Sequence, residues 1–157
     1  MNLRFSDRLS PVLEPHVPPN LVCFTSQIFH FFLDRELVEA ERYGNYSALL
    51  LFRAEEPKMD SDHDVIQELI KCVSENIRET DYLGSVDSRT VGVILKNTTV
   101  ENTKRVVERL GEEITLRLTY DQKTSDFEVS SAVYPTEANT YESLTALASD
   151  RLEGKIH

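Results

Sequence analysis

Two clusters of charged residues in this sequence have types and spacing that could support chemistry. The first is the acidic run DSDHD, which begins at Asp60 and supplies oxygen ligands of the kind that calcium prefers. A calcium loop of this type needs glycine at its sixth position and glutamate at its twelfth, where this sequence has Val65 and Lys71. We therefore interpret Asp60 or Asp62 as a cap of the helix that follows.

The second cluster is the Arg-x-x-Asp pair formed by Arg78 and Asp81. The planar fork of an arginine can bond phosphate oxygens in pairs, and a carboxylate accepts hydrogen bonds from neighbouring N–H groups. Two such residues near a helix end can instead form a surface ion pair that contributes about 0 to 1 kcal/mol. The spacing alone leaves both interpretations open.

The overall charge restricts the possible partners. The formal net charge is −10 and the isoelectric point is near 4.8, so the chain repels nucleic-acid backbones and anionic membranes. An anionic ligand therefore needs a locally basic pocket. Cys23 and Cys72 are far apart and belong to no CxxC motif, which is typical of a reducing compartment and gives no metal or redox signal.

The distribution of apolar and proline residues predicts one cytoplasmic domain. The longest apolar runs are far shorter than the roughly 20 residues that span a bilayer, and the amino terminus has no apolar stretch of signal-peptide length. Residues 1–20 hold four of the six prolines and are predicted to form an irregular segment. We expect a single globular domain over 21–157, without membrane insertion.

The periodicity of the apolar residues predicts the order helix, strand, helix, hairpin, helix, strand, helix. One ambiguous segment, 114–120, alternates like a strand yet can also extend the preceding helix. This order predicts the α+β class, with one sheet covered by helices. The predicted elements are helix 28–42, strand 47–53, a helix from 65 to near 78, hairpin strands 82–86 and 90–95, a helix from 100 to 110, strand 127–134 and helix 141–152.

Three stretches of sequence together resemble the GGDEF family of diguanylate cyclase domains. FFLDRELVEAERYGNYSALLLF, from Phe31, is similar to the family's first helix and strand. IRETDYLGSVDSRTVGVIL, from Ile77, is similar to the helix end and hairpin that carry the family's signature. VSSAVYPTEANTYESLTALASDRL, from Val129, is similar to the last strand and helix. The resemblance implies a palm-type central sheet, as in nucleotidyl cyclases, flanked by helices.

The resemblance also implies that the catalytic machinery has been replaced. The family's metal-binding DxDxFK stretch reads RAEEPK here, so Arg53 stands at the first metal position and would repel Mg²⁺. The signature glutamate is replaced by Thr90, so we expect no catalytic residues and no Mg²⁺ site. None of the five residues at the signature positions matches the family's letters: Asp87, Ser88, Arg89, Thr90 and Val91.

Other features of this region leave two weaker alternatives. The segment that follows Lys58 is too short for the family's usual phosphate-holding region. Glu55 can in principle hold a metal alone, but a single glutamate is more commonly a solvated surface residue. Residual use of GTP, with Arg53 and Arg89 contacting phosphates without a metal, is a weaker enzymatic alternative, since an arginine in a hairpin turn is commonly solvated.

A product-binding site of the family is kept in register. Many GGDEF domains bind cyclic di-GMP at an Arg-x-x-Asp motif five residues before the signature, and Arg78 and Asp81 have this spacing from Asp87. An arginine of the next helix usually joins the site, and an ungapped count places Arg109 there. The resemblance thus implies an inactive cyclic di-GMP receptor. The alternative is a ligand-independent interaction or dimerisation module, and in either case we expect a protein partner or a homodimer.

Overall fold

The computed structural model describes residues 23–54, 65–120 and 127–154. Within them the predicted order of helices and strands is confirmed. The elements are α2 (Ser26–Tyr43), β1 (Ser47–Ala54), α3 (Val65–Ser74), β2 (Tyr82–Ser85), β3 (Thr90–Lys96), α4 (Val100–Tyr120), β4 (Phe127–Tyr134) and α5 (Tyr141–Leu152). The predicted irregular segment 1–20, Glu55 and the acidic run 60–64 lie outside the described residues.

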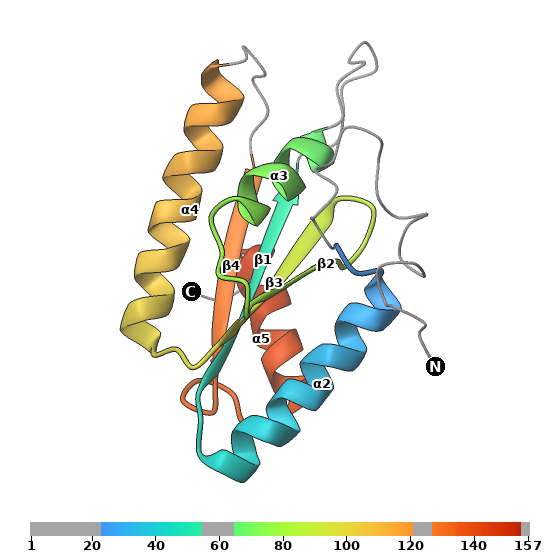
Figure 1. Cartoon of the computed structure of the whole chain (residues 1–157), viewed down its shortest axis with the longest axis vertical. Helices are drawn as coiled ribbons and strands as arrows, with labels where there is room; N and C mark the ends of the chain where they lie inside the picture. The colour runs from blue at the N-terminus through green and yellow to red at the C-terminus, as the bar shows by residue number, and fades with distance from the viewer. Residues whose placement is uncertain (1–22, 55–64, 121–126, 155–157) are drawn as a thin grey trace.

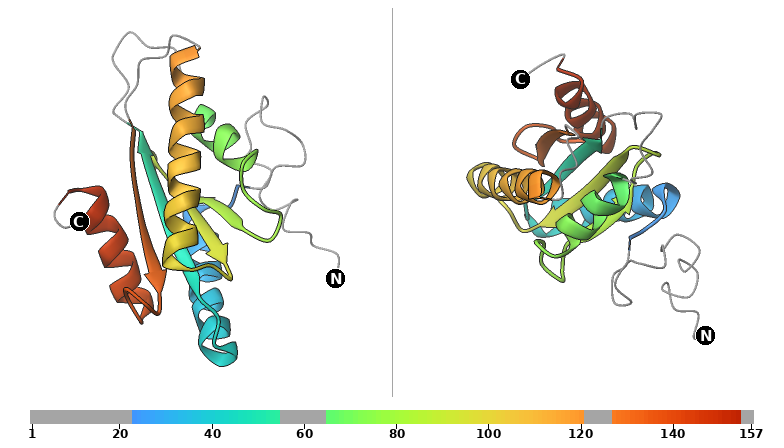
Figure 2. Two further views of the ribbon diagram at one scale, coloured as in Figure 1. Left: turned by 90° about the vertical axis from the view of Figure 1, so that its left-hand side faces the viewer. Right: turned by 90° about the horizontal axis from the view of Figure 1, so that it is seen from above.

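The four strands form one antiparallel sheet in the order β2-β3-β1-β4. Helices α3 and α4 cover one face, and helices α2 and α5 cover the other (Figures 1 and 2). This arrangement confirms the predicted α+β class with a central sheet flanked by helices. No helix in the described part of the chain is long and apolar enough to cross a membrane.

The central position of β1 follows from its sequence, SALLLFRA. Successive side chains of a strand point to opposite faces of the sheet. Ala48, Leu50 and Phe52 therefore pack under α3 and α4, while Leu49 and Leu51 pack against α2 and α5. Because both faces of β1 are covered, the strand is a nearly continuous apolar run rather than an alternating one.

Two glycines allow α2 to lie close to the sheet. Gly84 of β2 and Gly92 of β3 are directly opposite each other, and the Phe29 ring of α2 lies over both. A Cβ atom at Gly84 would be 2.5 Å from Phe29 Cδ1, and one at Gly92 would be 2.6 Å from Phe29 Cζ. Both distances are too short for packed carbon atoms, so only glycine fits these positions without a shift of α2.

The ambiguous segment 114–120 is helical and belongs to α4. Leu110, Ile114 and Leu118 are buried at four-residue spacing, whereas Leu116 is 64% exposed. A strand would have put Ile114, Leu116 and Leu118 on the same face of the sheet. The buried stripe continues the helical period of the preceding residues, so the strand interpretation is wrong.

The second predicted helix ends earlier than expected, at Ser74 instead of near Arg78. The Asn76 side chain donates to the Cys72 carbonyl at 2.7 Å, which occupies an acceptor of the last helical turn. The amide of Arg78 donates to Asp81 Oδ2 at 3.0 Å, and so does not continue the helical ladder. Arg78 and Asp81 therefore lie in the connection between α3 and β2, not on a helix surface.

Candidate functional site

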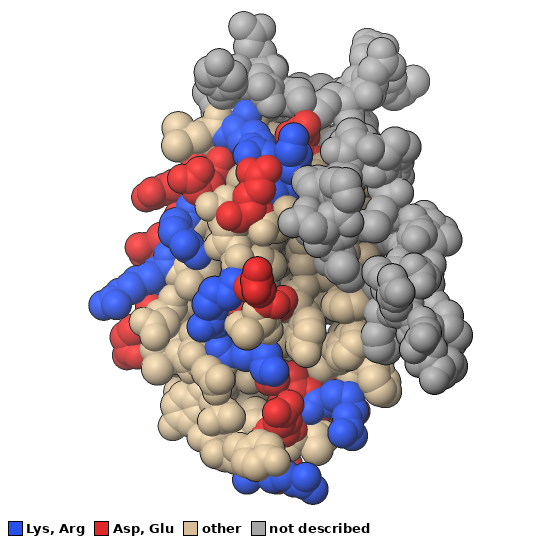
Figure 3. Space-filling view, viewed as in Figure 1, with Lys and Arg blue, Asp and Glu red and all other residues tan. Residues whose placement is uncertain are grey.

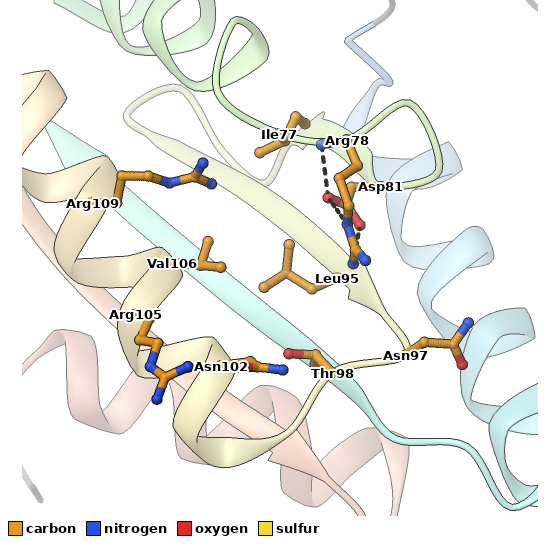
Figure 4. A pocket seen from close by; sticks show the side chains of 10 residues that line it. All are labelled: Ile77, Arg78, Asp81, Leu95, Asn97, Thr98, Asn102, Arg105, Val106 and Arg109. Atoms are coloured by element: carbon orange, nitrogen blue, oxygen red, sulfur yellow. Dashed lines mark hydrogen bonds and ion pairs between the residues drawn. The ribbon is translucent and has the colours of Figure 1, made fainter.

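A pocket of about 370 Å³ brings together the three residues predicted to bind a ligand (Figure 4). It lies between α4, the end of β3 and the connection from α3 to β2. Arg78 and Asp81 line one side and Arg109 lines the other, with Leu95 and Val106 between them. Its other lining residues are Ile77, Asn97, Thr98, Asn102 and Arg105.

The antiparallel pairing of β2 and β3 positions the acidic side of the pocket. Tyr82 lies opposite Ile94, so Asp81, just before β2, comes level with Leu95 and next to Lys96 at the end of β3. The Lys96 amide lies 3.4 Å from Asp81 Oδ1, and Arg78 Nη2 donates to the Lys96 carbonyl at 2.7 Å. The Arg-x-x-Asp pair thus also forms hydrogen bonds to the last residue of β3.

Asp81 is buried and its oxygens are already engaged. Its side chain is only 2% exposed, whereas that of Arg78 is 58% exposed. The carboxylate accepts from the Arg78 amide at 3.0 Å, from Nε at 3.3 Å and from Nη2 at 3.1 Å. Arg78 and Asp81 therefore form the ion pair that the sequence left open as an alternative, but its carboxylate is buried, and a ligand can reach these oxygens only if the Arg78 side chain moves.

Helix α4 supplies the cationic side of the pocket. Arg109 donates from Nη2 to the Asn76 carbonyl at 2.9 Å, so it reaches across toward the connection after α3. Arg105 lies one helical turn earlier and lines the same pocket. Sequence reasoning missed Arg105, although its four-residue spacing from Arg109 places both on one helix face.

The pocket is locally basic although the chain is acidic overall. Arg78, Arg105 and Arg109 line it together with the single carboxylate of Asp81. Figure 3 shows basic side chains gathered near the middle of the face seen in Figure 1. Local positive charge is what an anionic ligand needs on a protein with a net charge of −10.

Two of the residues that the family resemblance aligns with metal ligands, Arg53 and Thr90, lie side by side in the sheet. Arg53 of β1 is opposite Thr90 of β3 on one side and Glu128 of β4 on the other. The guanidinium of Arg53 is 3.0 Å from Glu128 Oε2, and Thr90 is buried. A cation and a neutral hydroxyl do not fit a divalent metal, which needs anionic oxygen ligands.

Of the other signature positions, 87–89 form the turn between β2 and β3, and Val91 belongs to β3. Asp87 Oδ1 accepts from the Arg89 amide at 2.8 Å, and Arg89 Nε donates to the Ala54 carbonyl at 3.0 Å. Asp87 and Ser88 are exposed, while Val91 is buried in the core. In the described part of the chain, no group of three or more His, Cys, Asp or Glu side chains is placed to hold a metal ion.

No protein-family model matches the sequence, and no curated protein matches it. Solved structures do match, and the class of protein that they define is the GGDEF diguanylate cyclase domain. The chain has the fold of this class. At 14–17% sequence identity, these matches establish the fold alone.

Three of the matching structures illustrate the likeness. The GGDEF domain of DgcB from Caulobacter crescentus, in complex with cyclic di-GMP, has a TM-score of 0.70 at 16% identity, with 91% of this chain and 88% of that one covered. The active GGEEF domain of a Vibrio cholerae diguanylate cyclase has a TM-score of 0.70 at 16% identity, covering 85% and 90%. The diguanylate cyclase SiaD from Pseudomonas aeruginosa, bound to its activator SiaC, has a TM-score of 0.71 at 15% identity, covering 96% and 60%.

Proposed function

We propose that this chain is a catalytically inactive GGDEF-fold signalling domain that binds cyclic di-GMP in the arginine-lined pocket. The observation that carries the proposal is the convergence of Arg78, Asp81 and Arg109 in one hollow. The similar fold of a domain solved in complex with cyclic di-GMP supports it. Binding would change the contacts of the domain with a partner protein or a second copy.

The hydrogen bonds of Asp81 indicate how a guanine base can enter. Arg78 Nε and Nη2 donate to the two oxygens of the carboxylate, a paired arrangement that guanine N1 and N2 can reproduce. A guanine edge can therefore take the place of the Arg78 head group. The Arg78 amide stays bonded to Asp81 and holds the carboxylate in position. The displaced guanidinium of Arg78, with Arg105 and Arg109, is then available to the two phosphates.

The absence of catalysis is supported by the residues at the metal positions. Arg53 carries a positive charge where the family has a metal ligand, and Glu128 neutralises that charge within the sheet. Thr90, its neighbour on β3, offers a hydroxyl where a carboxylate is needed. Incubation with GTP and Mg²⁺, followed by mass-spectrometric detection of cyclic di-GMP, tests this part. We expect no product, and turnover that Thr90→Ala abolishes would contradict the proposal.

Calorimetric titration with cyclic di-GMP tests the binding site. We expect micromolar affinity for the native chain and a loss of about tenfold or more in Arg78→Ala and in Arg109→Ala, because each charge-assisted bond contributes about 1.5 to 3 kcal/mol. Arg35→Ala is the matched control, since Arg35 is an exposed arginine of α2 outside the pocket. Absence of heat at tens of micromolar, or equal affinity of Arg78→Ala and Arg35→Ala, would overturn the proposal.

The second candidate function is a ligand-independent interaction module. It is favoured by the engagement of every Asp81 oxygen within the protein, which gives the Arg-x-x-Asp pair a structural role of its own. The similar cyclase SiaD is bound to a protein activator, which supports protein docking on this fold. Partner capture that is unchanged by added cyclic di-GMP and by Arg109→Ala favours this candidate, whereas capture that requires the nucleotide counts against it.

A further inference from the structure

Strand β4 lies at one edge of the sheet, and part of its outer backbone has no partner among the residues that the structure describes. Val133 faces away from β1, because its amide donates to Glu137 Oε1 at 3.1 Å. Ser131 faces the same way, because its carbonyl accepts from Arg151 Nη1 at 2.8 Å. Backbone groups of a strand alternate between sides, so the Ser131 N–H and both backbone groups of Val129 also point outward. Within the described residues, nothing bonds these three groups.

A groove of about 400 Å³ runs along this part of the edge. Thr103 and Lys104 of α4 line one side, and Arg151 of α5 reaches the other side. Figure 2 shows the edge of β4 between these two helices. The groove and the arginine-lined pocket share no lining residue, and they lie on different sides of α4.

The charged groups of the groove leave one cation in excess. Arg151 Nη2 is paired with Glu137 Oε2 at 2.8 Å, which neutralises both side chains. Lys104 is an exposed cation on the α4 side of the groove, so the lining residues together carry a net positive charge. A carboxylate that enters the groove can pair with Lys104.

We propose that the groove binds an extended acidic peptide segment of a partner protein, which adds to β4 as a fifth strand. Unpaired backbone groups at a sheet edge bind extended peptides through main-chain hydrogen bonds, and nearby side chains select the sequence. A second copy of this chain fits less well, because pairing β4 with β4 would bring the Lys104 cations of both copies to one interface. This inference goes beyond nucleotide binding and stands on a different surface.

Nuclear magnetic resonance titration of the full chain with synthetic peptides tests the proposal. The probe is the extended peptide Ser-Thr-Val-Glu-Val-Thr-Ser, added to millimolar concentration. Its two controls are the same peptide with lysine in place of glutamate and a backbone N-methylated version that keeps the side chains but lacks main-chain donors. We expect the probe to shift the amide signals of Val129 and Ser131. The lysine peptide should bind about tenfold more weakly, and the N-methylated peptide should cause no shift.

Two protein variants make the result specific. Ser131→Pro removes an outward N–H without removing a bond to β1, a position where an edge strand tolerates proline. Lys104→Glu reverses the charge of an exposed residue, so it remains informative even if Ser131→Pro disturbs the strand. We expect at least about tenfold weaker binding of the glutamate probe in both, with cyclic di-GMP titration heats equal to those of the native chain.

Three results would overturn the proposal. They are no shift at millimolar probe, equal binding of the N-methylated and unmodified peptides, or equal binding of the glutamate and lysine peptides to the native chain. Self-association in sedimentation velocity that Ser131→Pro abolishes would assign the edge to a second copy instead, and would also contradict it.

Discussion

Replacing Asp81 by alanine should destabilise the fold more than replacing Arg78, although Arg78 is the residue that a ligand meets first. Asp81 is buried and accepts two main-chain bonds, from the Arg78 amide at 3.0 Å and from the Lys96 amide at 3.4 Å. Removal of the carboxylate leaves both donors without their acceptor. The Arg78 side chain is 58% exposed, so water can replace the bonds that it loses.

The magnitudes follow from these bonds. A buried donor left without a partner costs about 1 to 3 kcal/mol. Loss of the bond from the Arg78 amide should cost this full amount of unfolding free energy. The bond from the Lys96 amide is longer than usual, so its loss should cost only a fraction of that amount. We therefore expect Asp81→Ala to lower the free energy of unfolding by about 2 to 4 kcal/mol. Arg78→Ala removes the exposed partner of a buried carboxylate, but the carboxylate keeps its two main-chain donors and water can enter the space of the guanidinium, so it should cost about 1 kcal/mol.

Urea unfolding followed by far-ultraviolet circular dichroism measures these differences, with Arg35→Ala as the reference for an exposed arginine. Asp81→Asn keeps an acceptor oxygen and should lie between the native chain and Asp81→Ala. For cyclic di-GMP affinity the proposed function predicts that Arg78→Ala is impaired even though it is nearly as stable as the native chain. Equal stability of Asp81→Ala and Arg78→Ala, or a more stable Asp81→Ala, would refute the reasoning that Asp81 holds the end of β3.

Three further measurements examine the packing and the titrating groups. Gly92→Ala should lower the free energy of unfolding by about 1 to 3 kcal/mol, because the added Cβ meets the Phe29 ring, and Phe29→Leu in the same chain should recover part of this loss in urea titrations. Burial raises the pKa of the Cys23 thiol to about 12, so alkylation by iodoacetamide in mildly alkaline buffer should be slow in the native protein and fast in urea, and equal rates would contradict the burial. The hydrogen bond from Arg151 lowers the pKa of Glu137. The stability that this shift contributes is therefore present above the ordinary glutamate pKa and is lost as the pH falls through the lowered pKa. Replacing Glu137 with glutamine should flatten the decline in melting temperature over that acidic range.

Local sequence patterns were enough to predict most of the elements of this fold. The predicted bounds of β4 and α5 agree with the structure, because proline follows one and a threonine cap precedes the other. The end of α4 was left open between strand and helix, since residues 114–120 fit both periods. The decision depends on which residues meet the sheet, and that is a tertiary property. The exposure of Leu116 follows from the way α4 packs on the sheet, which the local sequence does not specify.

Some features of the candidate site could likewise be predicted from the sequence, and others could not. The Arg-x-x-Asp spacing and the position of Arg109 could be read from the sequence, because they depend only on distance along the chain. The contribution of Arg105 and the burial of Asp81 could not be read, since both depend on α4 and β3 coming together around the pocket.

By itself, the sequence determined which side chains are available: arginines in register with an Arg-x-x-Asp pair, and Arg53 and Thr90 at the positions where the family resemblance predicts metal-binding carboxylates. The tertiary structure decided which of their atoms a ligand can reach. It turned the carboxylate of Asp81 inward, paired Arg53 with Glu128 across two strands, and left part of the outer edge of β4 without a partner among the described residues. The physical reason is that hydrogen-bond partners and solvent access are set by segments distant in the chain, whereas periodicity and spacing are local.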